Sequence, residues 1–207
     1  ETRQFDDPIS WVDYMHNFSY FFLHNGNLQE AERVNKECLA LVQELDHQIL
    51  MPGILDCLGT VAYKQGDYQK AQSLLQQSLA SVKEIGLVYF EAHVLGNLGK
   101  LATTLADYPR ASEYLEQGFQ LGFKINSAFS MAGTLVSFAE LYIAQGQIQQ
   151  AAEWLSVSKH HPSTENHQKM EAERLLETLQ NQLPPDEFTA ALERGKTLDL
   201  TKVVQEI

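Results

Sequence analysis

The side chains best suited to chemistry gather in one short stretch, "KHHPSTENH", at residues 159–167. Four of its members carry groups that commonly bind zinc: His160, His161, Glu165 and His167. A metal site is therefore one interpretation of the stretch. The other is a polar loop, because Pro162 cannot continue a helix. We favour the loop, and we predict neither a metal nor a cofactor.

No other pattern in the sequence is typical of an enzyme. The stretch "LGNLGK", Leu95–Lys100, has glycines and a lysine as phosphate loops do, but the full G-x-x-x-x-G-K-[ST] motif is missing. The stretch also falls within a predicted helix, where glycine allows close packing. Carboxylate pairs such as Asp6–Asp7, or Glu171 with Glu173, occur in any acidic chain, and neither a G-x-S-x-G elbow nor a recognisable Cys–His arrangement is present. We expect no catalytic residue and no enzyme activity.

Composition limits the class of protein. Hydrophobic residues make up 44% of the 207 residues, with 12 glycines and 6 prolines, which is enough for a folded core. The formal net charge of −12 repels nucleic acid, so we expect no direct contact with it. Cys38 and Cys57 make no disulfide framework and are expected to be buried thiols. Because no apolar run reaches the roughly 20 residues that span a bilayer, we predict a cytoplasmic protein without membrane contact.

The sequence repeats itself at a fixed interval. The segment "LGTVAYKQGDYQKAQSLLQQSL" starts at residue 58 and "LGKLATTLADYPRASEYLEQGF" at residue 98, which gives a period of about 40 residues. Alignment at this period gives columns of similar residues. One column consists of Ala31, Ala71, Ala111, Ala151 and Ala191. Other small residues form a turn column of Gly26, Gly66, Ala106 and Gly146, and a pair of Gly59 and Gly99.

Each column has a structural reason. Small side chains allow two helices to pack at an axis distance of about 8–10 Å. Glycine after a helical segment provides a left-handed C-cap, because it has no Cβ. The spacing of Leu55, Leu58 and Ala62 is typical of one helix face. We therefore predict an all-α protein in which about five antiparallel helix pairs stack into a right-handed α-solenoid, or superhelix.

The turn signals divide the chain into helices and repeats. Paired helices are predicted over 9–24 and 28–45, 49–65 and 68–85, 88–105 and 109–125, 127–145 and 148–159, and 165–182 and 186–194, with a short helix near 199–206. Residues 1–160 then hold four repeats, at about 8–46, 47–86, 87–126 and 127–160. Residues 161–207 hold a degenerate fifth repeat and a capping helix. Asn35 and Gly195 occupy positions where the other repeats have leucine, so the first and fifth repeats are the weakest.

The recurring residues resemble the tetratricopeptide repeat (TPR), on the pattern Leu58-Gly59, Gly66, Tyr68, Ala71, Leu75 and Leu79. The usual period is about 34 residues, so a longer period implies helices that are longer by about three residues each. Long-helix repeats of this kind are similar to the C-terminal arrays of MalT-like and LuxR/AfsR-type bacterial regulators, which are STAND-type signal-transduction ATPases. The tail from Glu171 onward resembles the closing segment of those proteins, at Leu183, Phe188, Gly195, Leu198 and Leu200.

In a stacked array the first helix of each pair lines the concave face. Four columns are expected there, away from the packing positions: His16, Asp56, Gly96 and Val136; Asn17, Cys57, Asn97 and Ser137; Tyr20, Thr60, Lys100 and Glu140; and Leu23, Tyr63, Thr103 and Ile143. Their variation fits a binding surface and fits plain solvent exposure equally well. Our candidate binding residues are Asn17, Tyr20, His24, Tyr63, Lys64, Asn97, Lys100 and Glu140. Asparagine and lysine among them can hold the amides or the carboxylate of a peptide.

Three functions stay open at this point. The first, implied by the resemblance, is the sensor part of a regulator, which binds a protein, a peptide or a small inducer and biases an upstream ATPase. The start "ETRQFDDPIS" has neither methionine nor a signal pattern, which suggests such a piece of a longer protein. The second is a free-standing TPR adaptor, and the third is a metal- or small-molecule-binding enzyme fragment. A homodimer through an exposed end of the array is a further option.

The packing column can be tested directly. Replacing Ala71 or Ala111 by leucine should lower the unfolding free energy by about 1–3 kcal/mol, because the added atoms force the paired helices apart. Thermal and denaturant melts of each variant measure this change. Melting temperatures equal to that of the wild type would contradict the packing assignment.

Overall fold

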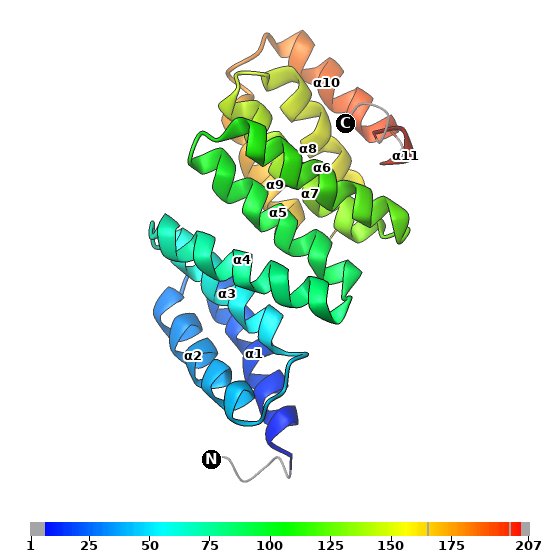
Figure 1. Ribbon diagram of the computed structural model, residues 1–207. Coiled ribbons are helices and arrows are strands. Elements are labelled where there is room, and N and C mark those ends of the chain that lie inside the picture. The colour runs from blue at the N-terminus through cyan, green and yellow to red at the C-terminus, as the bar shows by residue number, and fades with distance from the viewer. Residues whose placement is uncertain (1–6, 165, 199, 204–207) are drawn as a thin grey trace. The chain divides into compact units, whose positions relative to one another are not determined.

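The computed structural model describes residues 7–164, 166–198 and 200–203. Within this part every regular element is an α-helix, as Figure 1 shows. In chain order the helices are α1 (Pro8–His24), α2 (Leu28–Glu44), α3 (Met51–Lys64), α4 (Tyr68–Ile85), α5 (Val88–Thr104), α6 (Tyr108–Lys124), α7 (Ala128–Ala144), α8 (Ile148–His160), α9 (Asn166–Leu179), α10 (Pro185–Thr197) and α11 (Leu200–Val203). The predicted all-α class is confirmed. The predicted helix near 199–206 falls partly outside the described residues.

By its internal contacts the chain divides into two units, Glu1–Phe90 (unit 1) and Glu91–Ile207 (unit 2). Unit 1 contains α1 to α4 and the first residues of α5, and unit 2 contains the rest of α5 and α6 to α11. In unit 1, α1 packs on α2, α2 on α3, and α3 on α4. In unit 2, α6 packs on α7, α7 on α8, and α8 on both α9 and α10. The predicted grouping of four repeats up to residue 160 rests on the regularity of the repeats, which is a different criterion, and it stays a prediction.

The turn between paired helices has the same geometry in four places. The residue of the turn column lies at positive φ each time, at 76° for Gly26, 82° for Gly66, 77° for Gly146 and 58° for Ala106. In all four turns the next amide donates a hydrogen bond to the carbonyl five residues before it, which is the Schellman C-cap. Glycine takes this conformation without the Cβ clash that alanine suffers. The helix therefore ends where the column places its small residue.

The same turn also starts the second helix of each pair. The side chains of Asn27, Asp67 and Asp107 each accept a hydrogen bond from the backbone N–H three residues later. Such N-caps satisfy an amide that the first helical turn leaves without a partner. Gln147 occupies the matching position before α8 and makes no side-chain cap. One short segment thus ends one helix and begins its antiparallel partner.

The small-residue columns lie where paired helices meet. The alanines of the first column are all completely buried, and they are Ala31, Ala71, Ala111, Ala151 and Ala191. A Cβ on Gly59 would lie 2.8 Å from Leu75 Cγ, and one on Gly99 would lie 2.5 Å from Leu115 Cγ. Close-packed interiors have no space for such overlap. Any larger residue would therefore separate α3 from α4, or α5 from α6.

The C-terminal segment of unit 2 closes over the core of that unit. α10 packs against α8, where a Cβ on Gly195 would lie 2.6 Å from Ser156 Cβ. The sequence suggested that Gly195 marks a degenerate repeat, whereas its missing side chain is what permits this contact. Leu200 and Val203 of α11 are buried in the same cluster as Trp154. α11 therefore belongs to the core of unit 2.

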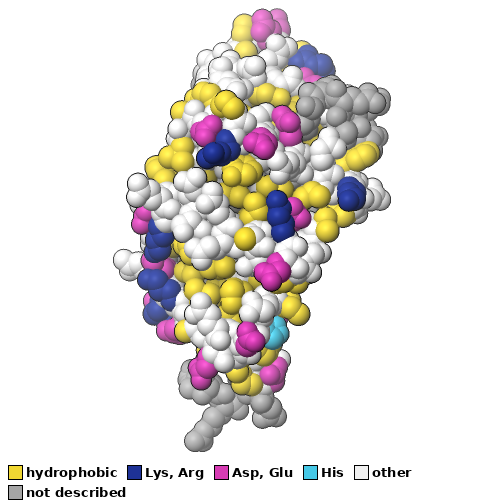
Figure 2. Space-filling view, in the orientation of Figure 1, with side chains coloured by type: hydrophobic (Ala, Val, Ile, Leu, Met, Phe, Trp, Pro, Cys, Tyr) yellow, Lys and Arg dark blue, Asp and Glu magenta, His cyan; other side chains and the backbone are white. Residues whose placement is uncertain are grey.

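The surface mixes acidic and basic side chains. Figure 2 shows dark-blue Lys and Arg side chains beside magenta Asp and Glu side chains on the face that it presents. Among the ion pairs of the described residues, Arg33 on α2 pairs with Glu30 and with Glu37, each at 2.8 Å. Exposed pairs of this kind contribute little to stability. Among the described helices, none is both long and apolar enough to cross a bilayer.

The turn geometry predicts that Ala106→Gly stabilises unit 2. Removing the Cβ relieves a strain of about 1–2 kcal/mol at positive φ, while the extra unfolded-chain entropy of glycine costs less, at about 0.4–1 kcal/mol. We expect the melting temperature to rise by about 1–3 °C. The opposite change at the matching turn of the same unit, Gly146→Ala, should lower it. Equal melting of both variants and the wild type would contradict the assigned strain.

Candidate interaction surface

The predicted residues Lys100 and Glu140 meet in unit 2, where two residues of α9 join them. Lys100 Nζ on α5 lies 2.7 Å from Glu140 Oε1 on α7. The same Nζ lies 3.9 Å from Glu171 Oε1 on α9, and Glu171 pairs with Arg174 at 2.8 Å. Three helices, each the first of its pair, thus contribute to one charged network.

Glu140 is the least exposed member of this network, with 17% of its side-chain surface accessible. Burial raises the pKa of Glu140 above its usual value, although the Lys100 ammonium acts in the opposite direction. The second carboxylate oxygen, Oε2, is buried and accepts no hydrogen bond from the described residues. Buried acceptors without a partner are uncommon in proteins. An incoming group therefore meets the other members of the network first, because Lys100, Glu171 and Arg174 keep 28%, 32% and 60% of their side-chain surface accessible.

Further polar side chains extend the network along the same three helices. On α5, Asn97 Nδ2 lies 3.3 Å from His93 Nε2. On α7, Gly133 leaves room for Gln168 of α9, whose amide nitrogen occupies the space that a Cβ would take. Ser137 lies one helical turn further along α7. We name this set the α5–α7–α9 face, and its members are His93, Asn97, Lys100, Gly133, Ser137, Glu140, Gln168, Glu171 and Arg174.

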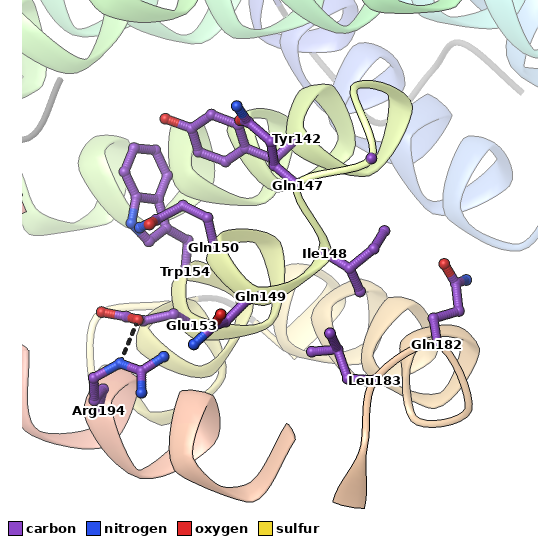
Figure 3. A pocket seen from close by; sticks show the side chains of 11 residues that line it. Tyr142, Gln147, Ile148, Gln149, Gln150, Glu153, Trp154, Gln182, Leu183 and Arg194 are labelled. Carbon is purple, nitrogen blue, oxygen red and sulfur yellow. Dashed lines mark hydrogen bonds and ion pairs between the residues drawn. The ribbon is translucent and has the colours of Figure 1, made fainter. Parts of the chain in front are cut away.

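A separate polar hollow lies beside α8 in unit 2 (Figure 3). It has a volume of about 1110 Å³ and is lined by the α7–α8 turn, α8, the segment between α9 and α10, and α10. Gln147 and Gln150 border it, and Arg194 Nε on one side donates to Glu153 Oε2 at 2.8 Å. Trp154 also lines it, and the indole N–H of this residue is buried and donates to no described group. The sequence did not single out this hollow.

Three of the other candidate residues lie on α1 in unit 1. Asn17 and His24 are exposed, and Asn17 Nδ2 donates to the Asp13 backbone oxygen at 2.8 Å. The Tyr20 ring is half-buried, with its centroid 5.0 Å from that of His16 and 6.4 Å from that of His24. Burial raises the pKa of Tyr20 well above its usual value, so the phenol stays protonated and can donate a hydrogen bond.

The last two candidates, Tyr63 and Lys64, are the final residues of α3. Tyr63 is half-buried, and its ring centroid lies 6.0 Å from that of Tyr68 at the start of α4. Lys64 is exposed. The candidates of unit 1 are therefore surface residues of two helices, whereas Lys100 and Glu140 belong to one network.

Several residues that were expected on the concave face are buried instead. At most 7% of the surface is exposed for each of His16, Leu23, Asp56, Cys57 and Val136. The prediction that these residues line an open face is wrong. The repeat period determines the spacing of equivalent positions but not the rotation of each helix about its axis. In the structure this rotation turns the five residues toward neighbouring helices.

Three of the helices in unit 1 meet at a buried polar cluster. His16 Nδ1 lies 2.9 Å from Asn35 Oδ1, and Asn35 Nδ2 donates to the Ala31 carbonyl at 2.8 Å and to Cys57 Sγ at 3.1 Å. Burial lowers the pKa of His16, and burial also raises the pKa of Cys57 to about 12 and that of Cys38 to about 11. Both thiols are free and buried, as predicted. A thiol with such a pKa stays protonated at neutral pH and is a poor nucleophile.

The histidine-rich stretch forms the end of α8 and the loop after it. His160 Nδ1 lies 2.9 Å from the Ser156 backbone oxygen, and His161 Nδ1 accepts a hydrogen bond from the Ser163 amide at 3.2 Å. Glu165 lies outside the described residues. In the part of the chain that the structure describes, no three His, Cys, Asp or Glu side chains are grouped so as to hold a metal ion.

Comparison at the repeat period missed Arg174 and gave Glu171 no role in binding. One period earlier, the positions that correspond to Glu171 and Arg174 hold Met131 and Thr134, so the comparison of repeats gave no charged column there. The spacing of Glu171 and Arg174, at i and i+3 on one helix face, was the available signal. It could show an ion pair but not the helix that the pair faces.

The sequence and the fold are similar to those of known helical-repeat proteins. A family model described as tetratricopeptide repeat matches residues 50–121. BtubC (BKLC) from P. vanneervenii has a TM-score of 0.66 and 18% identity, over 97% of this chain and 85% of that chain. TPR-like repeats of a kinesin-light-chain-like protein from Podosopora anserina give a TM-score of 0.61 at 21% identity, over 98% of this chain and 100% of theirs. A variant of those repeats with one substitution gives the same TM-score and coverage at 20% identity. No curated protein matches the sequence significantly.

These comparisons establish the class of the protein. The fold is the all-helical TPR-like repeat fold, and the matched residues 50–121 run from the start of α3 into α6. TPR arrays are helical scaffolds that present extended binding surfaces. The resemblance to the TPR that the sequence showed at Leu58, Gly66 and Ala71 is therefore confirmed for this region.

Glu32 in unit 1 provides a contrast to Glu140. Hydrogen bonds from Lys70, Gln65 and Lys36 lower the pKa of Glu32 from 4.5 to about 2. The folded state gains stability from Glu32 at neutral pH and loses it as the pH falls from 4.5 to about 2. The raised pKa of Glu140 acts in the opposite sense. Its contribution to stability is present below its usual pKa of 4.5 and is lost as the pH rises through its pKa in the folded state.

We therefore expect Glu32→Gln and Glu140→Gln to differ in the sign of their pH dependence. The measured quantity is the unfolding free energy of the wild type minus that of the variant. From about pH 3 to pH 7 this difference should grow for Glu32→Gln and shrink for Glu140→Gln. Urea melts at several pH values give both slopes. Slopes of the same sign would contradict the environments assigned to the two carboxyl groups.

Proposed function

We propose that this chain is a non-catalytic TPR interaction domain that binds a protein or peptide partner through the α5–α7–α9 face. The observation that carries the proposal is the network of Lys100, Glu140, Glu171 and Arg174, in which Glu140 Oε2 is buried without a hydrogen bond from the described residues. Ion pairs that serve packing alone usually satisfy their buried oxygens. A charged network from three helices, in which Lys100, Glu171 and Arg174 stay partly exposed, is better suited to a ligand.

The chemistry of this face favours a partner with amide and basic groups. The carboxylates of Glu140 and Glu171 accept hydrogen bonds from lysine, arginine or backbone N–H groups. Asn97 and Gln168 can both donate and accept, as a peptide backbone requires. The net charge of −12 attracts a basic partner and repels an acidic one. A peptide segment with at least one basic side chain fits these groups.

The wider role that we propose is the sensor part of a bacterial LuxR/AfsR-type transcriptional regulator. In such a protein a bound partner or small inducer shifts an upstream ATPase between two states through its different affinity for them, which is a form of signal transduction in the cytoplasm. The long period and the tail with Leu198 and Leu200 support this role through their resemblance to MalT-like arrays.

A free-standing TPR adaptor that scaffolds two proteins is the second candidate. The similarity to the kinesin-light-chain-like repeats favours it. The two roles differ in what the gene encodes before Glu1. The regulator requires a phosphate loop of the G-x-x-x-x-G-K-[ST] type in the same polypeptide, and the adaptor does not.

The binding face can be tested with a peptide-display library selected against the purified 207-residue protein. Ser137→Trp places a large ring in the middle of the α5–α7–α9 face. We expect the selected peptides to bind this variant at least about tenfold more weakly, because the ring blocks access to Lys100 and Glu140. Fluorescence anisotropy of labelled peptides measures the affinity.

Gln120→Trp is the matched control. Gln120 is exposed on α6, which is a second helix of the same unit, so the ring lies away from the proposed face. This variant should bind with wild-type affinity, and both variants should keep the wild-type melting temperature. Unchanged binding by Ser137→Trp, or an equal loss in Gln120→Trp, would overturn the assignment of the face.

A further inference from the structure

A row of aromatic side chains is exposed along α1 in unit 1. Tyr14 is 52% exposed, Phe18 is 41% exposed and Phe21 is 58% exposed. The rings of Tyr14 and Phe18 are stacked with centroids 6.3 Å apart, and those of Phe18 and Phe21 are stacked at 5.7 Å. Trp11 continues the row, with its ring 6.2 Å from that of Tyr14. We name these four residues, Trp11, Tyr14, Phe18 and Phe21, the α1 stripe.

The equivalent positions of later repeats are buried. One period further on, at α3, the counterparts of Tyr14, Phe18 and Phe21 are at most 4% exposed, and they are Ile54, Leu58 and Val61. At α7 in unit 2 the counterparts are again at most 4% exposed, and they are Thr134, Phe138 and Leu141. The α1 stripe therefore occupies the face through which a first helix packs on the helix pair before it.

Core contacts show what this face packs against within each unit. Ile54 and Leu58 share a buried cluster with Val34 and Val42 of α2. In unit 2, Phe138 and Leu141 share a cluster with residues of α6, among them Leu115 and Phe119. The stacking face of a first helix thus needs an apolar helix from a neighbouring pair. On α1 the same face carries the α1 stripe, and there the face is exposed.

We propose that the α1 stripe pairs with the α1 stripe of a second copy of this chain, with the two helices antiparallel about a two-fold axis. A stripe of flat rings along one helix is complementary to itself under such an axis, as a closed dimer requires. Aromatic residues are the side chains most enriched at interfaces between separate chains. Antiparallel pairing also places Asp7 at the start of one α1 near the partner's His24.

The charge of α1 fits a buried surface. Asp13 is the one formally charged side chain among its 17 residues, whereas α2, of the same length, has six. Interface cores between proteins are depleted of charged residues in this way. In a chain with a net charge of −12, a helix face with almost no charge can be buried against its own copy at little electrostatic cost.

Among the described residues of α9 and α10, the last helix pair of unit 2, no matching surface is present, which disfavours head-to-tail stacking of copies. In α10 the position that corresponds to Val34 of α2 is Arg194, which is 45% exposed and paired with Glu153. The exposed residues of α9 and α10 include His167, Glu173, Glu177, Asp186, Glu187 and Glu193. Stacking the α1 stripe on these residues would remove their charges from water, which is strongly unfavourable in free energy. The stripe therefore pairs with itself, and the assembly stops at two copies.

The size of the stripe predicts a weak dimer. An aromatic side chain can bury about 150–250 Å², so three half-exposed rings and their neighbours bury roughly 300–400 Å² per copy by the same scale. A standard interface buries about 800 Å² per partner. We therefore expect dissociation at micromolar concentrations, on the order of 10 µM or above.

Sedimentation velocity of the purified 207-residue protein, from about 1 to 300 µM, tests the dimer. The wild type should shift from monomer to dimer with concentration, and Phe21→Glu should remain a monomer throughout. Met170→Glu is the matched control, because Met170 is 68% exposed on α9 and lies outside the stripe. It should dimerise as the wild type does. Circular dichroism melts should show that all three proteins are folded.

Fluorescence locates the interface. The chain has two tryptophans, Trp11 in the stripe and Trp154 in the core of unit 2. In Trp154→Phe the emission comes from Trp11 alone, so it should shift to shorter wavelength over the concentrations at which the dimer forms. Adding Phe21→Glu should abolish the shift. A wild type that stays monomeric at every concentration, or a dimer that Phe21→Glu does not dissociate, would overturn the proposal and leave the stripe to a different helix.

Discussion

The close approach of two helices within each pair is the constraint on which the rest of this structure depends. Completely buried alanines recur once in every repeat from Ala31 to Ala191, and Gly59 and Gly99 lie so close to the leucines opposite that no Cβ would fit. Because the scaffold uses these few positions for packing, many others on the same helices are left without a packing role. The charged network around Glu140 occupies positions of that kind, whereas the ring stripe on α1 occupies positions that are buried in the later repeats.

Local chemistry explains why the helices could be predicted from the sequence. A glycine that accepts positive φ and an Asn or Asp that caps the next helix act within a few residues, so Gly66 and Asp67 predict a turn without knowledge of the rest of the fold. The same reasoning could not show which residues face outward. That depends on the rotation of each helix against its neighbours, which is why Asp56 and Val136 are buried although they were expected on an open face.

A buried polar residue can replace an apolar one in this repeat when neighbouring groups satisfy its hydrogen bonds. Asn35 occupies a position that later repeats give to leucine, and it stays completely buried because its amide bonds to His16, Ala31 and Cys57. The sequence suggested a weak first repeat at this point, whereas the structure shows a different way to fill the same space. The network with Lys100 likewise uses Glu171 and Arg174, which have no charged counterpart one period earlier.

The return of α11 to the core of unit 2 has a consequence for the order in which the chain folds. Leu200 and Val203 share a buried cluster with residues of α6, α7 and α8, which are made much earlier during translation. Until Leu200 and Val203 leave the ribosome, Trp154 and its neighbours lack part of their cover. Unit 1 ends at Phe90 and has all of its own residues available while unit 2 is still being synthesised. The core of unit 2 is therefore complete only after α11 has been synthesised.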